Sequence, residues 1–163
     1  MKKISIIVAI SENYGIGKDN KLLCYLSDDL KRFKKLTTAN VVVMGKITYK
    51  SLPKGALPNR KNIVITDDNK DNFDSCVMVH SIEDAIEKCD DVLENFIIGG
   101  GSIYRQFLPF ANKLYLTKIH KSFEADTFFP EINFDEWNLI EQEDFKADEK
   151  NQYDYTYLIY ERK

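Results

Sequence analysis

The sequence has few of the residues that build metal centres, disulfide frameworks or nucleophilic triads. Its 163 residues include three cysteines and two histidines. Cys24, Cys76 and Cys89 form no C-x-x-C pair and are odd in number, so we expect reduced thiols in a cytoplasmic protein. His80 and His120 lack the spacing of metal ligands. We therefore expect no metal and no Ser-His-Asp triad.

Long apolar runs and blocks of one charge are also missing. No stretch approaches the roughly 20 apolar residues of a membrane span, so no membrane association is expected. The short apolar run at residues 4–10 follows two lysines, but no small-residue cleavage pattern comes after it. We interpret this run as a buried strand rather than a signal peptide. A formal net charge of -3 argues against a nucleic-acid partner, because phosphate binding needs a concentrated basic surface.

The composition is typical of a folded α/β protein, with 44% hydrophobic, 12% aromatic and 30% charged residues. Apolar, β-branched runs alternate with amphipathic segments over the first two thirds of the chain. Such alternation predicts a sheet with right-handed parallel crossovers, covered by helices. The runs that we interpret as strands are residues 4–10, 41–44, 62–66, 76–79 and 95–98.

Three serines mark candidate helix starts. Ser27 is expected to cap a helix that carries acidic residues in its first turn and an apolar stripe at Leu30, Phe33 and Leu36. Ser81 is expected to cap a second helix, with Ile82, Ala85, Ile86 and Cys89 facing inward. Ser102 is expected to start a third helix, which Pro109 ends.

The last third of the chain predicts a different arrangement. Residues 113–120 and 153–161 read as strands, and no helical pattern separates them. We therefore expect antiparallel pairing at one side of the sheet, with the polar stretch 143–152 as a hairpin loop. The predicted fold class is α/β, with a central, mostly parallel sheet flanked by helices and an antiparallel C-terminal hairpin. No repeat or linker interrupts it, so residues 1–163 are expected to form one domain.

Three local features carry candidate chemistry, each with a structural alternative. Gly99, Gly100 and Gly101 join a strand to a helix, which fits a phosphate site or a tight turn without a ligand. The G-x-G-x-x-G spacing of a Rossmann domain is absent. Lys46, after a glycine at a predicted helix start, is either a phosphate partner or a solvated lysine. Arg60 is either a carboxylate clamp or a turn residue.

Asp29 is the most informative carboxylate. It lies in the first turn of the predicted helix, and Phe33 one turn later shares its face. An acid beside an aromatic ring fits a ligand site with a perturbed pKa, whereas the alternative is a helix-start aspartate that faces water.

Taken in order, the motifs resemble the bacterial dihydrofolate reductases from the first strand to near the end of the chain. The matching segments are V-A-I-S at 8–11, G-I-G at 15–17, N-K-L at 20–22, L-S-D-D-L at 26–30, F-K at 33–34, V-M-G-K-I-T-Y at 43–49, S-L-P at 51–53, L-P-N-R-K-N at 57–62, I-G-G-G at 98–101, Tyr104, L-Y-L-T at 114–117 and D-T-F-F-P at 126–130.

The resemblance implies hydride transfer from NADPH to 7,8-dihydrofolate, giving 5,6,7,8-tetrahydrofolate, in a monomeric cytoplasmic enzyme. Asp29 would hold the pterin edge and assist protonation at N5, Thr117 would hydrogen-bond Asp29, and Leu22 would belong to the catalytic set. The other implied substrate contacts are the carbonyls of Ile7 and Ile98, the walls Phe33, Leu52 and Leu57, and Arg60 on the glutamate carboxylate.

The resemblance also implies a cofactor path, and a lid at residues 11–26 that closes over the nicotinamide. Lys46, Thr48, Thr66 and His80 would face phosphates. The remaining cofactor contacts would be Ala9, Ile16, Gly17, Gly45, Ile47, Ser51, Gly99, Gly100, Gly101, Ser102, Ile103, Tyr104 and Gln106.

The sequence departs from the family pattern at three places. Leu23-Cys24 stands where Pro-Trp is usual, Lys46 where arginine is common, and Asp67 where a neutral residue often lies near the 2′-phosphate. The last two weaken the expected preference for NADPH over NADH. Two other functions remain open: a reductase of the same fold on another pterin-like or pyrimidine substrate, as in riboflavin synthesis, and a non-catalytic nucleotide-binding module.

Overall fold

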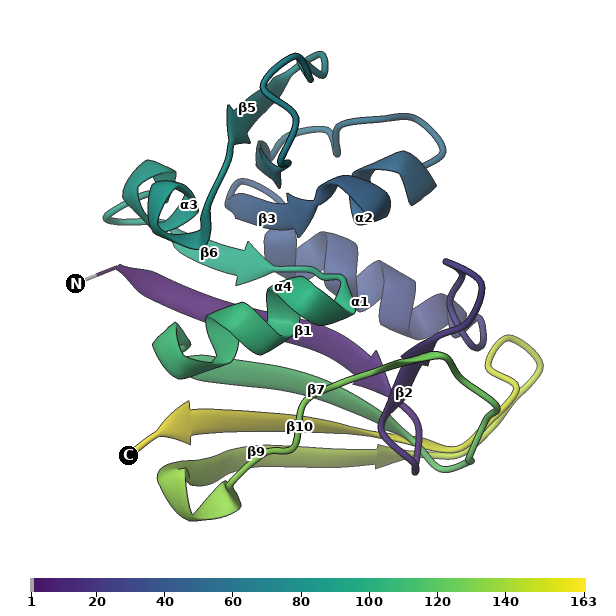
Figure 1. The fold of residues 1–163 in the computed structure, drawn as a ribbon. Helices are drawn as coiled ribbons and strands as arrows, with labels where there is room; N and C mark the ends of the chain where they lie inside the picture. The colour runs from purple at the N-terminus through teal and green to yellow at the C-terminus, as the bar shows by residue number, and fades with distance from the viewer. Residues whose placement is uncertain (1) are drawn as a thin grey trace.

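A single eight-stranded sheet forms the centre of the molecule in the computed structural model, which describes residues 2–163 (Figure 1). Met1, which the predicted domain includes, lies outside the described residues. The strands follow the order β5-β4-β3-β6-β1-β7-β10-β9. Their bounds are β1 Lys3–Ile10, β3 Val41–Gly45, β4 Lys61–Ile65, β5 Cys76–Val79, β6 Glu94–Ile97, β7 Lys113–Ile119, β9 Trp137–Phe145 and β10 Tyr155–Arg162.

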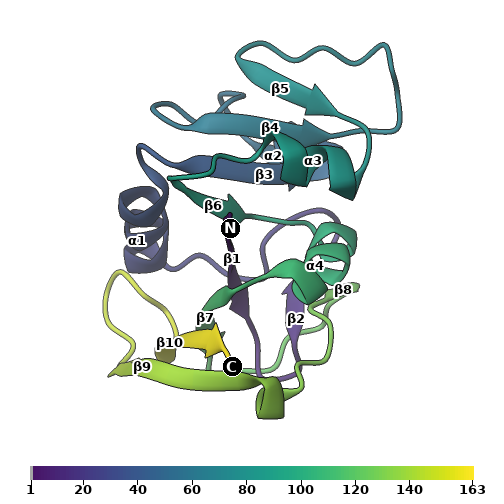
Figure 2. The same cartoon turned by 90° about the vertical axis from the view of Figure 1, so that its left-hand side faces the viewer.

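Neighbouring strands from β5 to β7 pair in parallel, whereas β10 pairs antiparallel with both β7 and β9. This arrangement confirms the predicted fold class. The helices cover both faces of the sheet, with α1 on one side and α3 and α4 on the other (Figure 2). Their bounds are α1 Ser27–Thr37, α2 Lys46–Ser51, α3 Ile82–Lys88 and α4 Gly101–Phe107, with short 3-10 turns at η1 Leu108–Phe110 and η2 Phe134–Glu136.

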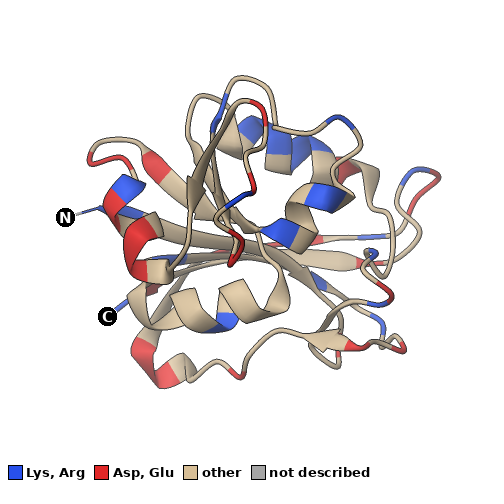
Figure 3. Ribbon diagram, turned by 45° about the horizontal axis from the view of Figure 1, so that its top comes forward, with Lys and Arg blue, Asp and Glu red and all other residues tan. Residues whose placement is uncertain are grey.

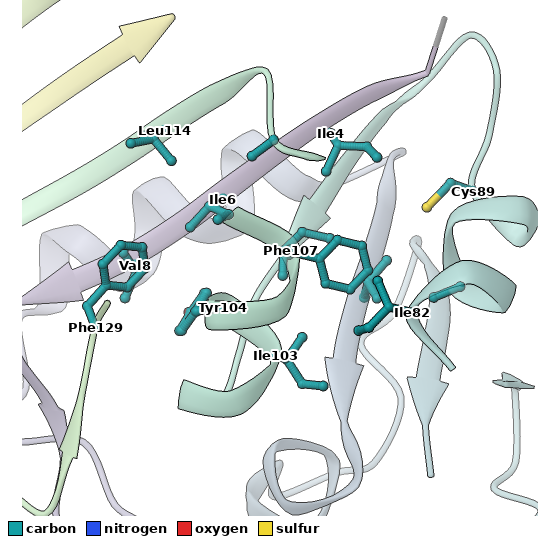
Figure 4. Packing of buried hydrophobic residues seen from close by; sticks show 14 of the residues in the cluster. Ile4, Ile6, Val8, Ile82, Cys89, Ile103, Tyr104, Phe107, Leu114 and Phe129 are labelled. Atoms are coloured by element: carbon teal, nitrogen blue, oxygen red, sulfur yellow. The ribbon is translucent and has the colours of Figure 1, made fainter. Parts of the chain in front are cut away.

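The period-2 alternation of strand side chains divides the core between the two faces of the sheet. Ile6 and Val8 of β1 pack with Ile103 and Phe107 of α4 on one face (Figure 4). Ile7, between them in the sequence, packs on the opposite face with α1. Burying a large apolar side chain stabilises the fold by about 1.5–3 kcal/mol, so both layers stabilise the sheet.

The start of α1 differs from the prediction. Ser27 is the first helical residue, Leu26 is the N-cap, and the cap residue makes no side-chain hydrogen bond. Instead the Asn151 carboxamide serves the helix start: its Oδ1 accepts from the Asp28 N–H at 3.1 Å, and its Nδ2 donates to Asp28 Oδ2 at 2.9 Å. The predicted Ser27 cap was therefore wrong, because a residue distant in the sequence supplies the acceptor. At Ser81 the predicted cap is confirmed, since Ser81 Oγ accepts from Asp84 N.

The boundaries of the C-terminal hairpin also differ. The prediction placed residues 143–152 in its loop, but β9 continues to Phe145 and β10 begins at Tyr155. The prediction missed β9 because the strand lies at the sheet edge and exposes most of its side chains, so no period-2 apolar pattern marks it. It also missed the two-stranded ribbon of β2 Gly15–Gly17 and β8 Thr127–Phe128, which are too short to show a pattern.

Parallel strands bring their carboxyl ends to one edge of the sheet, where ligands bind in open α/β folds. Gly45 at the end of β3 and Gly99 just after β6 meet there, with a hydrogen bond from Gly45 N to Gly99 O of 2.9 Å. The helices α2 and α4 begin directly after these points. Between residues 2 and 163, no helix has the length and apolar character needed to cross a membrane.

Candidate active site

Asp29 lies in the first turn of α1 and is fixed by a residue of the sheet. The Oγ1 of Thr117, a buried residue of β7, donates a hydrogen bond of 2.6 Å to Asp29 Oδ1. The structure therefore brings together the acid and the hydroxyl that the resemblance paired. Because Thr117 holds Oδ1, the hydrogen bond also fixes the orientation of Oδ2, the second oxygen of the Asp29 carboxyl group.

The surroundings of Asp29 favour its protonated form. Burial raises the pKa of Asp29 above its usual range, against the hydrogen bond from Thr117 and the charge of Arg32, which both lower the pKa. The guanidinium of Arg32 lies over the ring of Tyr157, 3.9 Å from the ring centre. Its positive charge is the one that lowers the pKa of Asp29. A carboxyl group whose pKa is raised toward neutrality is suited to holding and delivering a proton.

An apolar wall follows Asp29 on the same face of the sheet. Phe33, one turn along α1, packs in the cluster that also contains Leu52 and Leu57 from the segment between α2 and β4. Ile7 and Ile98 belong to the same cluster. These five residues are the predicted substrate walls and the residues predicted to offer accepting carbonyls, and tertiary packing gathers them in one cluster.

The Ile7 carbonyl already has one partner within the protein. Tyr104 Oη, from α4, donates a hydrogen bond of 2.9 Å to it, and burial raises the pKa of Tyr104, so this hydroxyl stays protonated. A carbonyl oxygen has two lone pairs and can accept a second hydrogen bond from a ligand. The predicted substrate contact (Ile7) and the predicted nicotinamide contact (Tyr104) therefore meet directly.

Arg60 is held in place by the end of α1 and by its own loop. Its guanidinium donates to Thr37 Oγ1 at 3.0 Å and to the Pro58 carbonyl at 2.9 Å. The buried Asn62 side chain pins the loop, since it accepts from the Leu57 N–H and donates to the carbonyls of Leu57 and Arg60. Arg60 thus lies beside the apolar wall, as a clamp for an anionic group would require.

The three glycines form a close junction between β6 and α4. Gly99 has φ +115 and its Cα faces the Tyr104 ring, while Gly101 is buried against Thr127 of β8. At Gly100 a side chain would meet only Thr48 Oγ1, at 3.6 Å, and at Gly45 it would meet Ile103 at 3.0 Å. Predicted cofactor residues from α2, α4 and β3 therefore converge at this junction, where Gly100 is the glycine with the most space beside it.

Lys46, Thr66 and His80 gather near the carboxyl ends of β3, β4 and β5. The Nδ1 of His80 lies 2.9 Å from the Thr66 carbonyl oxygen. Asp71 joins them: its Oδ2 lies 2.7 Å from Lys46 Nζ and accepts a hydrogen bond of 2.6 Å from Thr66 Oγ1. The prediction brought the first three residues to one place but did not include this aspartate.

The expected lid at residues 11–26 is tied to the chain around β8. Asn13 Nδ2 donates to the Phe123 carbonyl at 2.8 Å, and the Asp19 N–H donates to Asp126 Oδ2 at 2.9 Å. Ile16 of the lid reaches Gly101, where its Cδ1 would lie 3.8 Å from a Cβ. The lid therefore covers the glycine junction through β2 and β8.

Comparison with known proteins agrees with this geometry. The Dihydrofolate reductase family matches residues 3–162. Dihydrofolate reductase of Staphylococcus haemolyticus is 46% identical over 160 residues, covering 98% of this chain and 96% of the relative, and that of Bacillus subtilis (strain 168) is 44% identical, with 98% and 95% covered. The chain belongs to the dihydrofolate reductase family.

A solved structure of a family member supports the same conclusion. The dihydrofolate reductase from Enterococcus faecalis, complexed with NADP(H) and RAB-propyl, superposes with a TM-score of 0.91 at 36% identity, covering 98% of this chain and 96% of that one. The predicted family, the predicted fold and the predicted reductase activity are confirmed. A reductase of riboflavin synthesis and a non-catalytic module are both disfavoured by relatives that carry the dihydrofolate reductase name.

Several residues that the resemblance placed at the family site lie at its margin. Leu22 and Ile47 are 67% and 66% exposed. Ser51 Oγ donates to the Thr48 carbonyl, and Gln106 donates to Ser102 Oγ on the outer face of α4. Ala9, near the carboxyl end of β1, and Gly17, in β2, are partly buried. The roles of all of these residues stay predictions.

Four residues that support the site were missed. They are Arg32 near Asp29, Asn62 under the Arg60 loop, Asp71 on Lys46 and Asn151 at the start of α1. For Arg32 a signal existed, because residues three apart on a helix are neighbours. For Asn151 the contact spans 123 residues and leaves no local trace. The ribbon of α1 beyond its first turn and that of α2 carry Lys and Arg positions, whereas α3 carries mainly Asp and Glu positions (Figure 3).

Proposed function

We propose that this chain reduces 7,8-dihydrofolate to 5,6,7,8-tetrahydrofolate with NADPH, and that Asp29 assists protonation of N5. The observation that carries the proposal is the Asp29 carboxyl group, fixed by Thr117 at 2.6 Å beside an apolar wall. Its raised pKa matches the need for a proton at the reacting ring. Leu22, in the lid, is the third member of the proposed catalytic set, with Asp29 and Thr117.

The substrate-binding residues divide by chemistry. Asp29 accepts hydrogen bonds from the amidine-like edge of the pterin, and the carbonyls of Ile7 and Ile98 accept from its amino group. Phe33, Leu52 and Leu57 enclose the flat rings and exclude water, since they already pack together. Arg60 is anchored at Thr37 and binds the glutamate carboxylate, because a guanidinium matches that group with two parallel hydrogen bonds.

The proposed cofactor-binding residues offer hydrogen-bond donors and a cation for the phosphates of NADPH, and a glycine junction with room for its diphosphate. Bound NADPH supplies the hydride. Gly100 lets the backbone approach a diphosphate, because the one side-chain neighbour of a Cβ there lies 3.6 Å away, and Gly45, Gly99 and Gly101 form the rest of this phosphate-facing junction. Lys46 and Thr66 supply a cation and a hydroxyl for the 2′-phosphate. The remaining contacts are Ala9, Ile16, Gly17, Ile47, Thr48, Ser51, His80, Ser102, Ile103, Tyr104 and Gln106.

A direct assay tests the function. Purified protein is mixed with NADPH, and the loss of NADPH absorbance is followed when dihydrofolate is added. We expect absorbance to fall only when both compounds are present. A protein that binds NADPH without consuming it in the presence of dihydrofolate would contradict the proposal and favour a nucleotide-binding module.

Lys46 should set part of the preference for NADPH over NADH. We expect NADPH to give the higher kcat/KM in the parent enzyme. Replacing Lys46 with alanine should raise KM for NADPH by about tenfold and leave kcat nearly unchanged, because a charge-assisted hydrogen bond to a bound phosphate contributes about 1.5–3 kcal/mol. The control is Lys54→Ala, which removes the charge of an exposed lysine just after α2. Equal efficiency of the parent with NADH and NADPH would overturn the assignment.

Cys24, at the position where the family usually has tryptophan, should not act as a second acid. Burial, and secondarily the charge of Asp29, raise the pKa of Cys24 to about 11, so the thiol keeps its proton near neutral pH. We expect Cys24→Ala to change kcat by less than about a hundredfold, the lower end of general acid catalysis. Cys76→Ala serves as the matched control. Complete loss of turnover in Cys24→Ala alone would assign the thiol a chemical role.

We further propose that residues 1–163 work as one monomeric, cytoplasmic domain whose partners are dihydrofolate and NADPH, with no nucleic acid and no membrane. Support comes from the continuous sheet and from free thiols at Cys24, Cys76 and Cys89. Size-exclusion chromatography with light scattering tests the monomer. A mass of twice 19.0 kDa would contradict it.

A further inference from the structure

Asp71 places a carboxylate where the proposed function places a phosphate. One oxygen, Oδ2, meets both Lys46 Nζ at 2.7 Å and Thr66 Oγ1 at 2.6 Å. The Asp71 and Lys46 side chains are 16% and 31% exposed, so this ion pair is partly covered by the protein. The cation and the hydroxyl expected to receive an anionic ligand are therefore engaged by an anion of the chain itself.

The loop between β4 and β5 holds this carboxylate in position. Thr66 N donates to the Val79 carbonyl, which ties the start of the loop to β5. Thr66 Oγ1 accepts from the Asp68 N–H at 3.2 Å, and Asp71 N donates to the Asp68 carbonyl at 3.1 Å. A tight turn thus presents Asp71 to Lys46 across the gap between β4 and α2.

We propose that Asp71 is a specificity-determining residue that competes with the 2′-phosphate of NADPH for Lys46 and Thr66 and thereby narrows the discrimination against NADH. The inference rests on the proposed function, which assigns the 2′-phosphate to Lys46 and Thr66. The enzyme thus carries an internal anion, Asp71, that lowers its own preference for NADPH over NADH.

The charges around Lys46 explain the direction of the effect. Asp71 first, and then the charges of Asp68 and Asp67, raise the pKa of Lys46. The positive charge of Lys50 helps to lower the pKa of Asp71. The Lys46 ammonium first, and then the Thr66 hydroxyl, hold the pKa of Asp71 below its usual range, so Asp71 is ionised near neutral pH. A phosphate monoester carries about -1.5 to -2 charge at pH 7. Binding it beside Asp71 costs like-charge repulsion, whereas a dinucleotide without that phosphate meets no such cost.

The test compares binding of NADP⁺ and NAD⁺ to Asp71→Asn by isothermal titration calorimetry. Asparagine keeps the shape and removes the charge. We expect Kd for NADP⁺ to fall by roughly tenfold while Kd for NAD⁺ changes less than about twofold, since removal of a nearby like charge favours only the phosphorylated ligand. Asp74→Asn is the matched control, because Asp74 is an exposed carboxylate of the same loop and its replacement removes the same charge. Thermal unfolding of each variant checks that the fold is intact.

Weaker binding of NADP⁺ to Asp71→Asn would overturn the inference, since Asp71 would then orient Lys46 for the phosphate. Unchanged binding, or an equal gain for NAD⁺, would also overturn it. The underlying assignment is tested separately by Lys46→Ala. If Lys46→Ala leaves the NADP⁺ to NAD⁺ ratio unchanged, the assignment of Lys46 fails; a gain in Asp71→Asn would still show that Asp71 opposes the phosphate.

A double variant tests the competition directly. Replacing Asp71 with asparagine should improve the affinity for NADP⁺ less in the Lys46→Ala background than in the parent enzyme. Coupling of this kind is expected when two residues share one partner. Full additivity of the two changes would contradict direct competition for Lys46.

Discussion

Asp29→Asn should lower the rate of hydride transfer at pH 7 by roughly a hundredfold to ten-thousandfold, the range of general acid–base assistance. Asparagine keeps the shape of the side chain and its hydrogen bond with Thr117, but it loses the acidic proton and the charge that attracts the pterin edge. Single-turnover measurement with NADPH and dihydrofolate isolates the chemical step. A variant as fast as the parent at pH 7 would show that Asp29 is not the acid.

The rate of hydride transfer should also depend on pH differently in the parent enzyme and in Asp29→Asn. The raised pKa of Asp29 means that the parent keeps a protonated acid at higher pH than an exposed aspartate would. Its rate should fall as pH rises through that pKa. The asparagine variant depends on dihydrofolate protonated in solution, so its rate should continue to climb as pH falls. Parallel pH profiles for the two enzymes would contradict this mechanism.

Stability provides the control for Asp29→Asn. A carboxyl group whose folded pKa is raised binds its proton more tightly in the folded state. The resulting stability is fully present below the unfolded pKa and is lost as pH rises through the folded pKa. Because pH 7 lies above the ordinary pKa of an aspartate, the raised pKa of Asp29 disfavours folding there, and Asp29→Asn should melt at the same temperature as the parent or higher. A large loss of rate without a loss of Tm assigns the effect to chemistry.

Gly99→Ala should cause the largest loss of stability among these variants, about 2–6 kcal/mol in the free energy of unfolding. The backbone at Gly99 has φ +115, where an alanine costs on the order of 1–3 kcal/mol. Its Cβ would also lie 3.1 Å from Tyr104 Cε2 in a filled core, and overpacking typically costs a further 1–3 kcal/mol. Urea unfolding measures the change.

Gly100→Ala is the matched control for that experiment. Its backbone has φ -82, and its Cβ would meet only Thr48 Oγ1, at 3.6 Å. We expect a stability loss below about 1 kcal/mol, within the range of surface substitutions and mild strain. The added methyl group should instead raise KM for NADPH, because it projects into the glycine junction. Equal destabilisation by the two substitutions would contradict the distinction between strain and ligand space.

The pattern of apolar residues along the sequence determined the fold class. Apolar runs too uniform for a one-sided sheet predicted parallel strands, and β1, β3, β4, β5 and β6 are confirmed as such. The absence of a helical pattern between residues 120 and 153 predicted the antiparallel end of the sheet, which β7 and β10 form. These elements could be predicted because the periodicity of apolar residues is visible in the sequence itself, before any contact between strands is known.

The resemblance placed Asp29 and Thr117 in one site, although the local pattern of Asp29 alone favoured a helix-start aspartate that faces water. Packing decided that question, since α1 lies on the sheet with its first turn against β7. Burial of the first turn then raises the pKa of Asp29. The residue type is a property of the sequence, whereas its acidity is a property of its surroundings.

Only the tertiary structure decided the supporting contacts. Ser27 has the chemistry of a cap, yet Asn151 serves the start of α1 because the hairpin loop approaches it there. The strand β9 carries no apolar alternation and exists through its ladder with β10. Asp71 is an ordinary loop aspartate in sequence, and its hold on Lys46 arises where the β4–β5 loop approaches α2. A hydrogen bond or an ion pair needs atoms within about 3 Å, and only the folded chain sets such distances between residues far apart in the sequence.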